Sequence, residues 1–294
     1  AFKSHGNIVS MTGDGVNDAP SLKYADIRVA MGITGTDVAK GASDMILTDD
    51  NFSTIVHAIE EGRNIYNNIK KAVIFLLSCN LGEVIAIFFS ILMNWPVPLH
   101  ATQILWINLI TDSLPAISLG MDPGDHDVMK QSPRNPKESF FARGAGARAI
   151  LGGLLIGLLT LGAFYYGLWE HNYTFSNISA SLGTKEFKYA LSYARTMAFV
   201  VLAASQLFYS LSMRSSTKSI FQVGLFKNKY LIGSIVLGLF LQLLVISVPA
   251  FARAFGVQFL SINDWGLVLV FALIPLIINE IIKIFMRVAK KKKE

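Results

Sequence analysis

Cysteine is scarce in this sequence, which has only Cys79 among 294 residues. One cysteine excludes an internal disulfide, and because Cys79 lies inside an apolar run we assign it no redox role. The five histidines are scattered along the chain and do not suggest a metal cluster. No signal peptide, internal repeat or low-complexity tract is evident apart from the lysine run at 290–293.

Charge is also scarce. Charged residues make up 16% of the chain, hydrophobic residues make up 52%, and the mean hydropathy is +0.47. This composition is too apolar for an ordinary soluble domain and is typical of a membrane protein with polar connections. Much of the net charge of +6 lies in the run at 290–293. A basic flank beside an apolar span is the usual positive-inside signal, so we expect no nucleic-acid binding.

Residues 1–50 predict a soluble α/β segment. Strands are expected at 7–11, 27–30 and 45–47, joined by a glycine-rich turn that leads into a helix and by a loop with a short helix. Strands that alternate with helices indicate a parallel sheet. A piece of about 50 residues buries too little surface to stand alone. We therefore expect it to complete a domain whose earlier strands are not in this chain.

Apolar segments dominate the rest of the chain. One helix is expected from about Asn51, capped by Asp50, Asn51 or Ser53, with an amphipathic stalk at 51–71 and an apolar part at 72–93. Five more segments are long enough to cross a bilayer: 99–121, 149–169, 189–213, 230–251 and 265–285. The sequence thus predicts a mostly α membrane protein with six transmembrane helices within 72–289.

The distribution of basic residues predicts the orientation of these spans. Six spans place both ends of the chain on the same side, and most Lys and Arg residues fall on that side, including a basic tail at 290–294. The opposite loops hold few basic residues: Lys185, Lys188 and Arg253. By the positive-inside rule, both ends are expected in the cytosol.

The stretch 105–120, LWINLITDSLPAISLG, places polar side chains inside an apolar span. Asn108, Thr111 and Asp112 fall at i, i+3 and i+4 and share one helix face. Pro115 removes the hydrogen bond that the Thr111 carbonyl would receive, which predicts a broken helix with a free carbonyl. Hydrocarbon tolerates such groups only where they meet a partner or line a cavity.

The preceding span carries Asn80 and Glu83 at i and i+3, again on one face. A glutamate at mid-bilayer costs at least ~2.5–3.5 kcal/mol on insertion scales, so it is functional by default. A protonated glutamate that ties two helices together is the alternative. With the 105–120 face, the carboxylates, amides, hydroxyl and carbonyl approach the roughly six to eight oxygens that Ca²⁺ prefers. Cys79 is expected to point ~100° away from Asn80, which leaves no soft-metal site.

The motif TGDGVNDAP follows the first predicted strand. Gly13 and Gly15 permit a tight turn. Asp14 and Asp18 are hard oxygen ligands four residues apart, with Asn17 between them, an arrangement that suits Mg²⁺ beside a phosphate. For an isolated Asp-Gly turn, a capped loop with solvated carboxylates is the alternative.

The string MTGDGVNDAPSL, followed by VAMG, GTDVAK, LTDDNFSTIV and GRNIYNNIKK, resembles the end of the phosphorylation domain of type II P-type ATPases. These pumps belong to the haloacid-dehalogenase superfamily, which implies a Rossmannoid α/β head before the membrane bundle. The resemblance runs through all six spans and is strongest from Met11 to Pro136. It implies that Asp14 binds Mg²⁺ with a phosphorylated aspartate and that Asn17 and Asp18 organise that site.

The segments CNLGEV and NLITDSLPA resemble the fifth and sixth helices of sarcoplasmic reticulum calcium pumps. The resemblance implies a set of ligands for a transported ion: Asn80, Glu83, Asn108, Thr111 and Asp112. In the fourth span, AASQLFYSL offers Gln206 where reticulum pumps have a ligating glutamate. That segment and the extra residue in MGITGTDVAK look more like plasma-membrane calcium pumps. A neutral Gln206 leaves open whether two ions bind per cycle, and an interhelical hydrogen bond is its alternative role.

Several parts of the family pattern are not in this sequence. They are the Asp-Lys-Thr-Gly-Thr nucleophile motif, the Thr-Gly-Glu dephosphorylation motif, the nucleotide-binding domain and the first four membrane helices. The chain therefore resembles the C-terminal third or so of a pump, and alone it is expected neither to bind ATP normally nor to hydrolyse it. With no long regulatory tail and no organelle signal, a bacterial plasma membrane is the expected location.

Alternative functions stay open at this point. The same pump architecture could carry Mn²⁺, which also takes oxygen ligands, or Na⁺. Sodium pumps usually have a second carboxylate in the sixth helix, where this chain has Ser113 after Asp112. A phosphatase head on a passive membrane anchor would not need aligned polar residues in the spans. A channel would leave the Asp14 motif unexplained.

Other polar residues receive structural interpretations. Glu280 and Lys283 are expected to form a local pair, Arg195 to snorkel, and Gln242 has no assigned partner. A solvated loop, or alternatively an ion entry funnel, is expected to hold three acidic residues: Asp122, Asp125 and Asp127. Close helix packing is predicted at three glycines: Gly152, Gly153 and Gly157.

Overall fold

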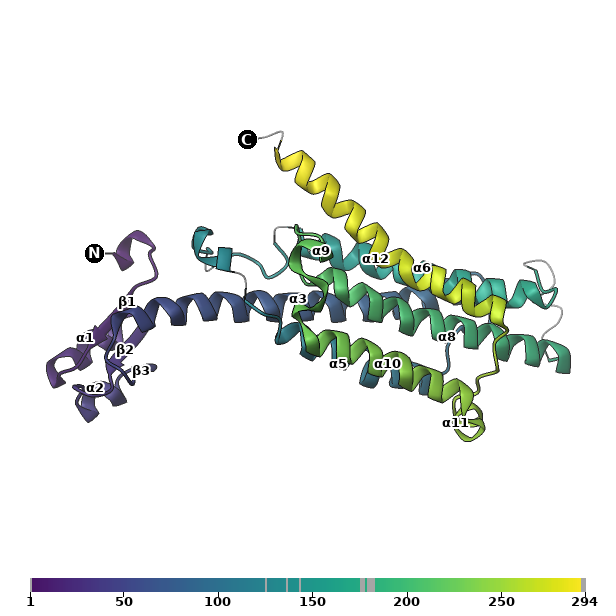
Figure 1. The fold of residues 1–294 in the computed structure, drawn as a ribbon, viewed down its shortest axis with the longest axis horizontal. Coiled ribbons are helices and arrows are strands. Elements are labelled where there is room, and N and C mark those ends of the chain that lie inside the picture. Colours follow the sequence, from purple (N-terminus) through teal and green to yellow (C-terminus); the bar gives the residue numbers. More distant parts are fainter. Residues whose placement is uncertain are drawn as a thin grey trace. The chain divides into compact units, whose positions relative to one another are not determined.

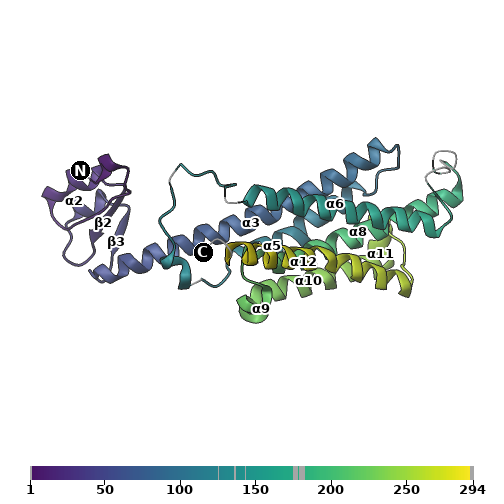
Figure 2. The ribbon, with the colours of Figure 1, turned by 90° about the horizontal axis from the view of Figure 1, so that it is seen from above.

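The computed structural model describes residues 2–124, 126–135, 137–142, 144–174, 178 and 183–291. The chain divides into two compact units. The first comprises Ala1–Asn64 with His126–Gln131, and the second comprises Ile65–Asp125 with Ser132–Glu294. Figure 1 and Figure 2 show the elements of each unit from two directions.

The first unit is built on a parallel sheet of β1 (Ser10–Gly13), β2 (Ile27–Met31) and β3 (Met45–Leu47), in that order. The helices α1 (Ala19–Tyr24) and α2 (Asp37–Gly41) connect successive strands, and short 3₁₀ turns occur at η1 (Lys3–His5), η2 (Val16–Asp18) and η4 (His126–Lys130). The predicted parallel sheet is therefore confirmed. Its buried core is small: Leu22, Ala30, Ala39 and Ala42 form one cluster, and Val29 and Leu47 are also buried.

A carboxylate fixes the loop that follows β2. Asp50 Oδ1 accepts hydrogen bonds from the backbone N–H groups of Gly32 at 2.6 Å and Ile33 at 3.0 Å, and Oδ2 accepts one from Thr34 at 2.8 Å. A Cβ at position 32 would lie 2.4 Å from the Leu47 carbonyl oxygen, so this position requires glycine. The bonds from Ile33, Thr34 and Gly32 lower the pKa of Asp50 to about 2.

The helix α3 (Phe52–Leu92) is continuous for 41 residues. Because Asp50 is held by the preceding loop, the cap of this helix comes from Asn51, whose Oδ1 accepts a hydrogen bond from the Ser53 backbone at 3.0 Å. The first part of α3 belongs to the first unit and the rest to the second.

Four further long helices make up most of the second unit: α6 (Ala145–Glu170), α8 (Lys185–Met213), α10 (Lys229–Ser247) and α12 (Ile262–Lys291). With α3, they are the five described helices long and apolar enough to cross a membrane. The most apolar stretch of α8 is 94% buried, against 28–50% for the others, which makes α8 the centre of this unit. Figure 1 shows α8 alongside α6 and α12. The connections include three short helices: α9 (Ile220–Val223), η5 (Leu225–Lys227) and α11 (Pro249–Phe255).

The predicted span at 99–121 forms three consecutive helical pieces: α4 (Ala101–Trp106), η3 (Ile107–Asp112) and α5 (Ser113–Gly120). The predicted break at Pro115 is wrong, because the chain stays helical through it and the irregularity is a π-helical turn, η3. Hydroxyl groups satisfy carbonyls of this turn. Thr111 Oγ1 donates to the Ile107 carbonyl, and Ser113 Oγ donates to the Asn108 carbonyl, both at 2.8 Å. The helix can therefore widen instead of breaking.

Glycines bring α3 and α6 into backbone contact. A Cβ at Gly157 would lie 2.8 Å from the Gly82 carbonyl oxygen, and one at Gly153 would lie 2.9 Å from the Ser78 carbonyl oxygen. A Cβ at Gly152 would lie 2.3 Å from the Tyr209 hydroxyl. The predicted close packing at these three glycines is confirmed, and it fixes the face of α3 that carries Glu83.

Candidate ion site between α3, η3 and α8

Three buried polar side chains from three helices meet in the second unit. Glu83 on α3 is 5% exposed, and Asp112 on η3 and Gln206 on α8 are fully buried. Asp112 lies within electrostatic reach of Glu83, and Gln206 lies beside the Glu83 carboxylate. Burying two carboxylates together is unfavourable unless a positive group compensates them.

Unpartnered polar atoms concentrate at this cluster. In the described part of the chain, seven buried side-chain nitrogen and oxygen atoms lack a hydrogen-bond partner, and five of them are here. They are Glu83 Oε1, both oxygens of Asp112 and both polar atoms of Gln206. Because buried polar groups are normally satisfied, this concentration points to a ligand that supplies the missing interactions.

The neighbouring amide and hydroxyl groups present oxygen atoms to the same place. Asn108 Nδ2 donates to Glu83 Oε2 and to the Ile104 carbonyl, both at 3.0 Å. Thr111 is fully buried and donates its hydroxyl hydrogen to the Ile107 carbonyl. Each group thus uses hydrogens on the protein and keeps oxygen lone pairs for a cation. The π-helical turn η3 supplies Asn108, Thr111 and Asp112, and such turns are frequent at functional sites.

Asn80 is the predicted site residue that the structure does not bring into this cluster. Its side chain is exposed on α3, and its Nδ2 donates to the Leu76 carbonyl at 2.8 Å. Cys79 lies close to Asp112 and is fully buried, a neighbour that helix geometry alone did not indicate. Among the described residues, no three His, Cys, Asp or Glu side chains converge on one point. The site therefore relies on amide and hydroxyl oxygens as well as on two carboxylates.

The TGDGVNDAP motif forms a tight loop at the end of β1 in the first unit. Asp18 Oδ2 accepts hydrogen bonds from the backbone N–H groups of Gly15 at 2.9 Å and Asp14 at 3.1 Å. These bonds lower the pKa of Asp18 below its ordinary value of 3.8. A Cβ at Gly13 would lie 2.6 Å from the Asp18 Cβ, so the loop needs glycine there. Asn17 and Asp14 are exposed, and the Asp14 carboxylate at a parallel-strand end fits a Mg²⁺ ligand.

Comparison with known protein families identifies the family of this chain. A family model described as "Cation transporting ATPase, C-terminus" matches residues 96–285. The chain belongs to this family. The match runs from before α4 through the π-helical turn to residue 285 within α12, and it includes Asn108, Asp112 and Gln206.

Individual relatives match over nearly the whole chain. The chain is 57% identical over 284 residues to calcium-transporting ATPase 1 of Bacillus cereus, which covers 97% of the chain and 32% of the relative. It is 46% identical over 275 residues to a calcium-transporting ATPase of Bacillus subtilis, covering 94% of the chain and 29% of the relative. It is 43% identical over 283 residues to calcium-transporting ATPase type 2C member 1 of Pongo abelii, covering 96% and 29%. The chain thus covers about a third of the length of these relatives. Its apolar helices, together with these relatives, support a multi-pass membrane protein.

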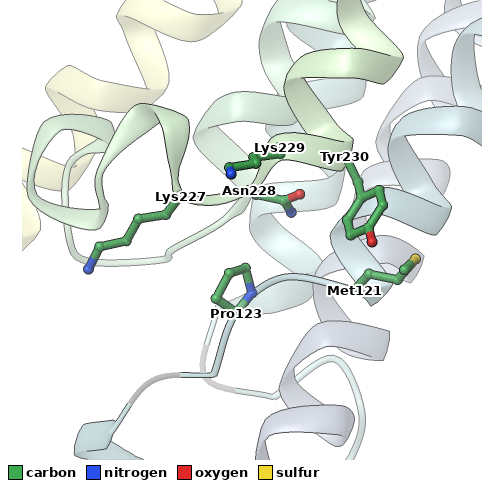
Figure 3. A pocket seen from close by; sticks show the side chains of 6 residues that line it. All are labelled: Met121, Pro123, Lys227, Asn228, Lys229 and Tyr230. Carbon is green, nitrogen blue, oxygen red and sulfur yellow. The ribbon is translucent and has the colours of Figure 1, made fainter.

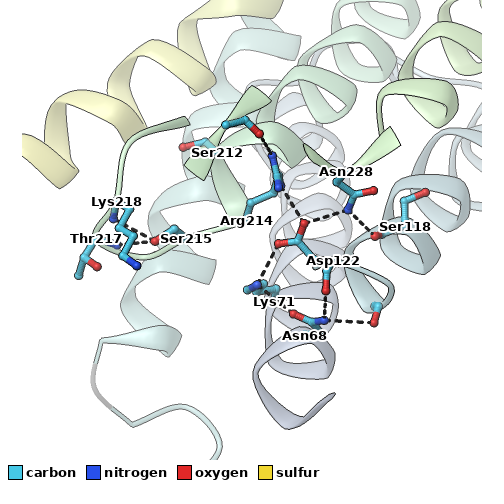
Figure 4. Close-up of polar contacts among 12 residues, drawn as sticks. Asn68, Lys71, Ser118, Asp122, Ser212, Arg214, Ser215, Thr217, Lys218 and Asn228 are labelled. Carbon is cyan, nitrogen blue, oxygen red and sulfur yellow. Dashed lines mark hydrogen bonds and ion pairs between the residues drawn. The ribbon is translucent and has the colours of Figure 1, made fainter. Parts of the chain in front are cut away.

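Figure 4 shows a second polar cluster in the same unit, centred on Asp122. Asp122 Oδ1 is 2.9 Å from Arg214 Nε and 3.0 Å from Asn228 Nδ2, and Oδ2 is 3.0 Å from Lys71 Nζ. Asn68 Nδ2 donates to the Asp122 carbonyl at 2.7 Å. This cluster joins α3, the end of α5, the end of α8 and the start of α10.

The prediction of a solvated acidic loop is therefore wrong for Asp122, whose side chain is 3% exposed. Asp122 is buried because the fold brings Lys71 and Arg214 to its carboxylate, and the spacing of residues in the sequence does not reveal these contacts. Asp127 is exposed and pairs with Lys130 at 2.9 Å, as a solvated loop implies, and Asp125 lies outside the described residues.

The remaining polar predictions have mixed outcomes. The Glu280–Lys283 pair is confirmed at 2.6 Å, but Lys283 is buried and also donates to the Ser212 carbonyl. Gln242, which had no assigned partner, accepts a hydrogen bond from Trp106 Nε1 at 3.2 Å. Arg195 Nε donates to the Val97 carbonyl at 2.9 Å, which gives the guanidinium a protein partner.

Proposed function

We propose that this chain supplies the membrane domain of an ATP-driven pump that exports Ca²⁺ through an aspartyl-phosphate intermediate. The observation that carries the proposal is the convergence of unpartnered oxygens from Glu83, Asp112 and Gln206 in a buried position. The three relatives described above are calcium-transporting ATPases, which supports Ca²⁺ as the transported ion.

The chemistry of the cluster suits a hard divalent cation. Ca²⁺ takes about six to eight oxygen ligands from carboxylates, amides, carbonyls and water. The two carboxylates neutralise its charge, and Asn108, Thr111 and Gln206 add neutral oxygens. When no cation is bound, two charged carboxylates cannot stay buried together without a large desolvation cost, so occupancy changes which arrangement of α3 and η3 is favoured. Asn80 would join as a ligand if its amide turned from α3 toward Glu83.

The loop at the end of β1 would hold the Mg²⁺ that the complete pump uses in phosphorylation. Mg²⁺ held there would neutralise charge on the phosphoryl group. Asp14 would contribute the exposed carboxylate, while Asp18, with Gly13, Gly15 and Asn17, shapes the loop and keeps that carboxylate in place. We assign ATP binding and the nucleophilic aspartate to the part of the pump that precedes this chain, and we expect the chain alone to be inactive.

The continuous helix α3 is the element through which phosphorylation would change the ion site. It begins in the unit that carries Asp14 and carries Glu83 in the other. A shift of α3 along η3 would break the Asn108–Glu83 hydrogen bond and separate the carboxylates. The ion would then bind less tightly and leave, because the two states differ in their affinity for it.

The proposal also assigns a membrane topology to the chain. We assign residues 1–50 to a cytosolic haloacid-dehalogenase-like head, 51–71 to a stalk, 72–289 to six transmembrane helices and 290–294 to a cytosolic tail. The α4–η3–α5 run would be the second of the six spans. The Asp122 cluster joins the middle of α3 to the end of α5, the end of α8 and the start of α10, and its basic residues fit the cytosolic side of a plasma membrane.

An ion panel tests this assignment. The complete pump in proteoliposomes should hydrolyse ATP when supplied with Ca²⁺, and an Asp14→Asn variant should not. Activation by Mn²⁺ that matches Ca²⁺ in affinity and maximal rate would show that the site does not distinguish the two. Activation by Na⁺ without a divalent transport ion would contradict the proposal.

A further inference from the structure

A pocket with a basic rim lies at the end of the second unit, away from the ion site. It has a volume of about 300 Å³ and is lined by Met121, Pro123, Lys227, Asn228, Lys229 and Tyr230. Figure 3 shows Met121 and Pro123, which follow α5, on one side, and the segment 227–230, which leads into α10, on the other.

The two lysines of this pocket have no counter-charge. Lys227 and Lys229 are exposed, and within the described residues neither ammonium group makes a hydrogen bond or ion pair. The nearby Asp122 does not neutralise them, because its oxygens are taken by Lys71 and Arg214. The pocket therefore carries two available positive charges at the end of a membrane-capable helix.

Asn228 holds these lysines in a fixed place. Its side chain is buried between them, and its Nδ2 donates to the Ser118 carbonyl at 2.8 Å and to Asp122 Oδ1 at 3.0 Å. Its Oδ1 accepts the Leu231 backbone N–H at 2.9 Å and so caps α10. The backbone that bears Lys227 and Lys229 is thus anchored before any ligand arrives, which lowers the entropy cost of binding.

Apolar and aromatic side chains surround the charges. Met121 is 51% exposed, Tyr230 is 64% exposed, and Phe226, which precedes Lys227 in the chain, is 72% exposed. Lysine next to tyrosine at a helix end is typical of the membrane interface, where one ligand presents a charged phosphate and an apolar chain together. Inorganic phosphate has no apolar part that could contact Met121 or Tyr230.

We propose that this pocket binds the headgroup of an anionic phospholipid. Lys227 and Lys229 donate to its phosphate and anionic substituent, while Met121 and Tyr230 contact the first carbons of its acyl chains. A basic residue near an anionic lipid surface contributes about a fivefold gain in affinity, so the pair should contribute roughly 30-fold.

Equilibrium binding of fluorescent short-chain phosphatidylglycerol to the complete pump in neutral detergent tests this site. The Lys227→Gln/Lys229→Gln variant should bind this lipid roughly 30-fold more weakly, approaching the affinity for phosphatidylcholine. The Lys227→Arg/Lys229→Arg variant should keep the affinity of the unmodified pump, because charge and hydrogen-bond donors are retained.

The matched control is Lys185→Gln/Lys188→Gln, which removes the same charge from exposed positions at the start of α8. It should leave phosphatidylglycerol binding unchanged. Equal affinity of the unmodified pump and the Lys227→Gln/Lys229→Gln variant would overturn the proposal. Displacement of the lipid by millimolar inorganic phosphate would also overturn it, in favour of a free-phosphate site. Because the readout is lipid binding, its failure is separate from a failure of ion transport.

Discussion

Asn108 Nδ2 lies 3.0 Å from Glu83 Oε2 and joins η3 to α3 at the candidate ion site. The same contact leaves Glu83 Oε1 buried with no partner. The hydrogen bond thus occupies one carboxylate oxygen and leaves the other without a partner in the cluster that also contains Asp112 and Gln206. In the proposed site, this hydrogen bond would position Glu83 as a ligand, and it would break if α3 moved relative to η3.

Replacing Gln206 by leucine should separate folding stability from ion affinity. Both polar atoms of Gln206 are buried and unpartnered, so their removal should leave stability unchanged or raise it by up to ~1–3 kcal/mol. Ca²⁺ affinity should fall, because an oxygen is lost from the site. Thermal unfolding of the complete pump, with and without Ca²⁺, measures both effects.

Gln103→Leu is the matched control for that variant. Gln103 is equally buried, but its Oε1 accepts the His100 N–H at 2.8 Å and its Nε2 donates to the Phe255 carbonyl at 3.1 Å. This variant should lose about 1–3 kcal/mol of stability and keep its Ca²⁺ affinity. Unchanged Ca²⁺ affinity in Gln206→Leu would remove Gln206 from the site.

The close packing of α3 on α6 predicts that a Gly→Ala substitution changes stability in opposite directions at Gly157 and Gly233. Gly157→Ala places a methyl group 2.8 Å from the Gly82 carbonyl oxygen and should destabilise the protein by about 1–3 kcal/mol. Gly233→Ala on α10 meets nothing within 4 Å and should stabilise it by up to ~1 kcal/mol. Thermal unfolding of both variants gives the comparison, and equal shifts would argue against the close approach of α3 and α6.

The Asp122 cluster predicts a large effect of removing one charge. Asp122→Asn leaves Arg214, whose side chain is 4% exposed, without its ion pair and should cost about 3–5 kcal/mol. Asp127→Asn, the same change at an exposed pair with Lys130, should cost no more than ~1 kcal/mol. Thermal unfolding separates them. Similar small losses in both would mean that the Asp122 ion pairs do not hold the helix ends together.

Sequence patterns identified Glu83 and Asp112 because a carboxylate in an apolar span needs a reason to be there. They also identified the packing glycines and the parallel strands, since these follow from residue size and local alternation. The π-helical turn was not predictable in this way. It depends on competition between hydroxyl and backbone groups around Thr111 and Ser113, which helical spacing does not encode.

The burial of Asp122 was equally inaccessible from the sequence. Its partners Lys71, Arg214 and Asn228 are 51, 92 and 106 positions away, so only the folded helices bring them together. A loop rich in aspartate, glycine and proline is most simply interpreted as solvated. The exposure of Asn80 shows the converse limit, since a shared helix face with Glu83 does not guarantee a shared contact.

Acid should loosen the loop after β2 through Asp50. Its pKa is lowered from 3.8 to about 2, so its contribution to stability is complete above pH 3.8 and is lost as the pH falls through about 2. Hydrogen-exchange protection of residues 32–34, corrected for intrinsic rates, should decline across this window. In Asp50→Asn, protection should already be low at neutral pH and stay flat across the window. Asp37→Asn, at an exposed position, should behave like the unmodified protein.

The most direct measurement of the central claim is Ca²⁺-dependent phosphorylation of the complete pump by ATP in Glu83→Gln and Asp112→Asn. Each variant removes one buried charge of the proposed site while preserving side-chain size. Both should form no phosphoenzyme at Ca²⁺ concentrations that saturate the unmodified pump. Glu186→Gln, an exposed position at the start of α8, should phosphorylate normally. Normal Ca²⁺-dependent phosphoenzyme in both site variants would contradict the assignment of Glu83 and Asp112 to the transported ion.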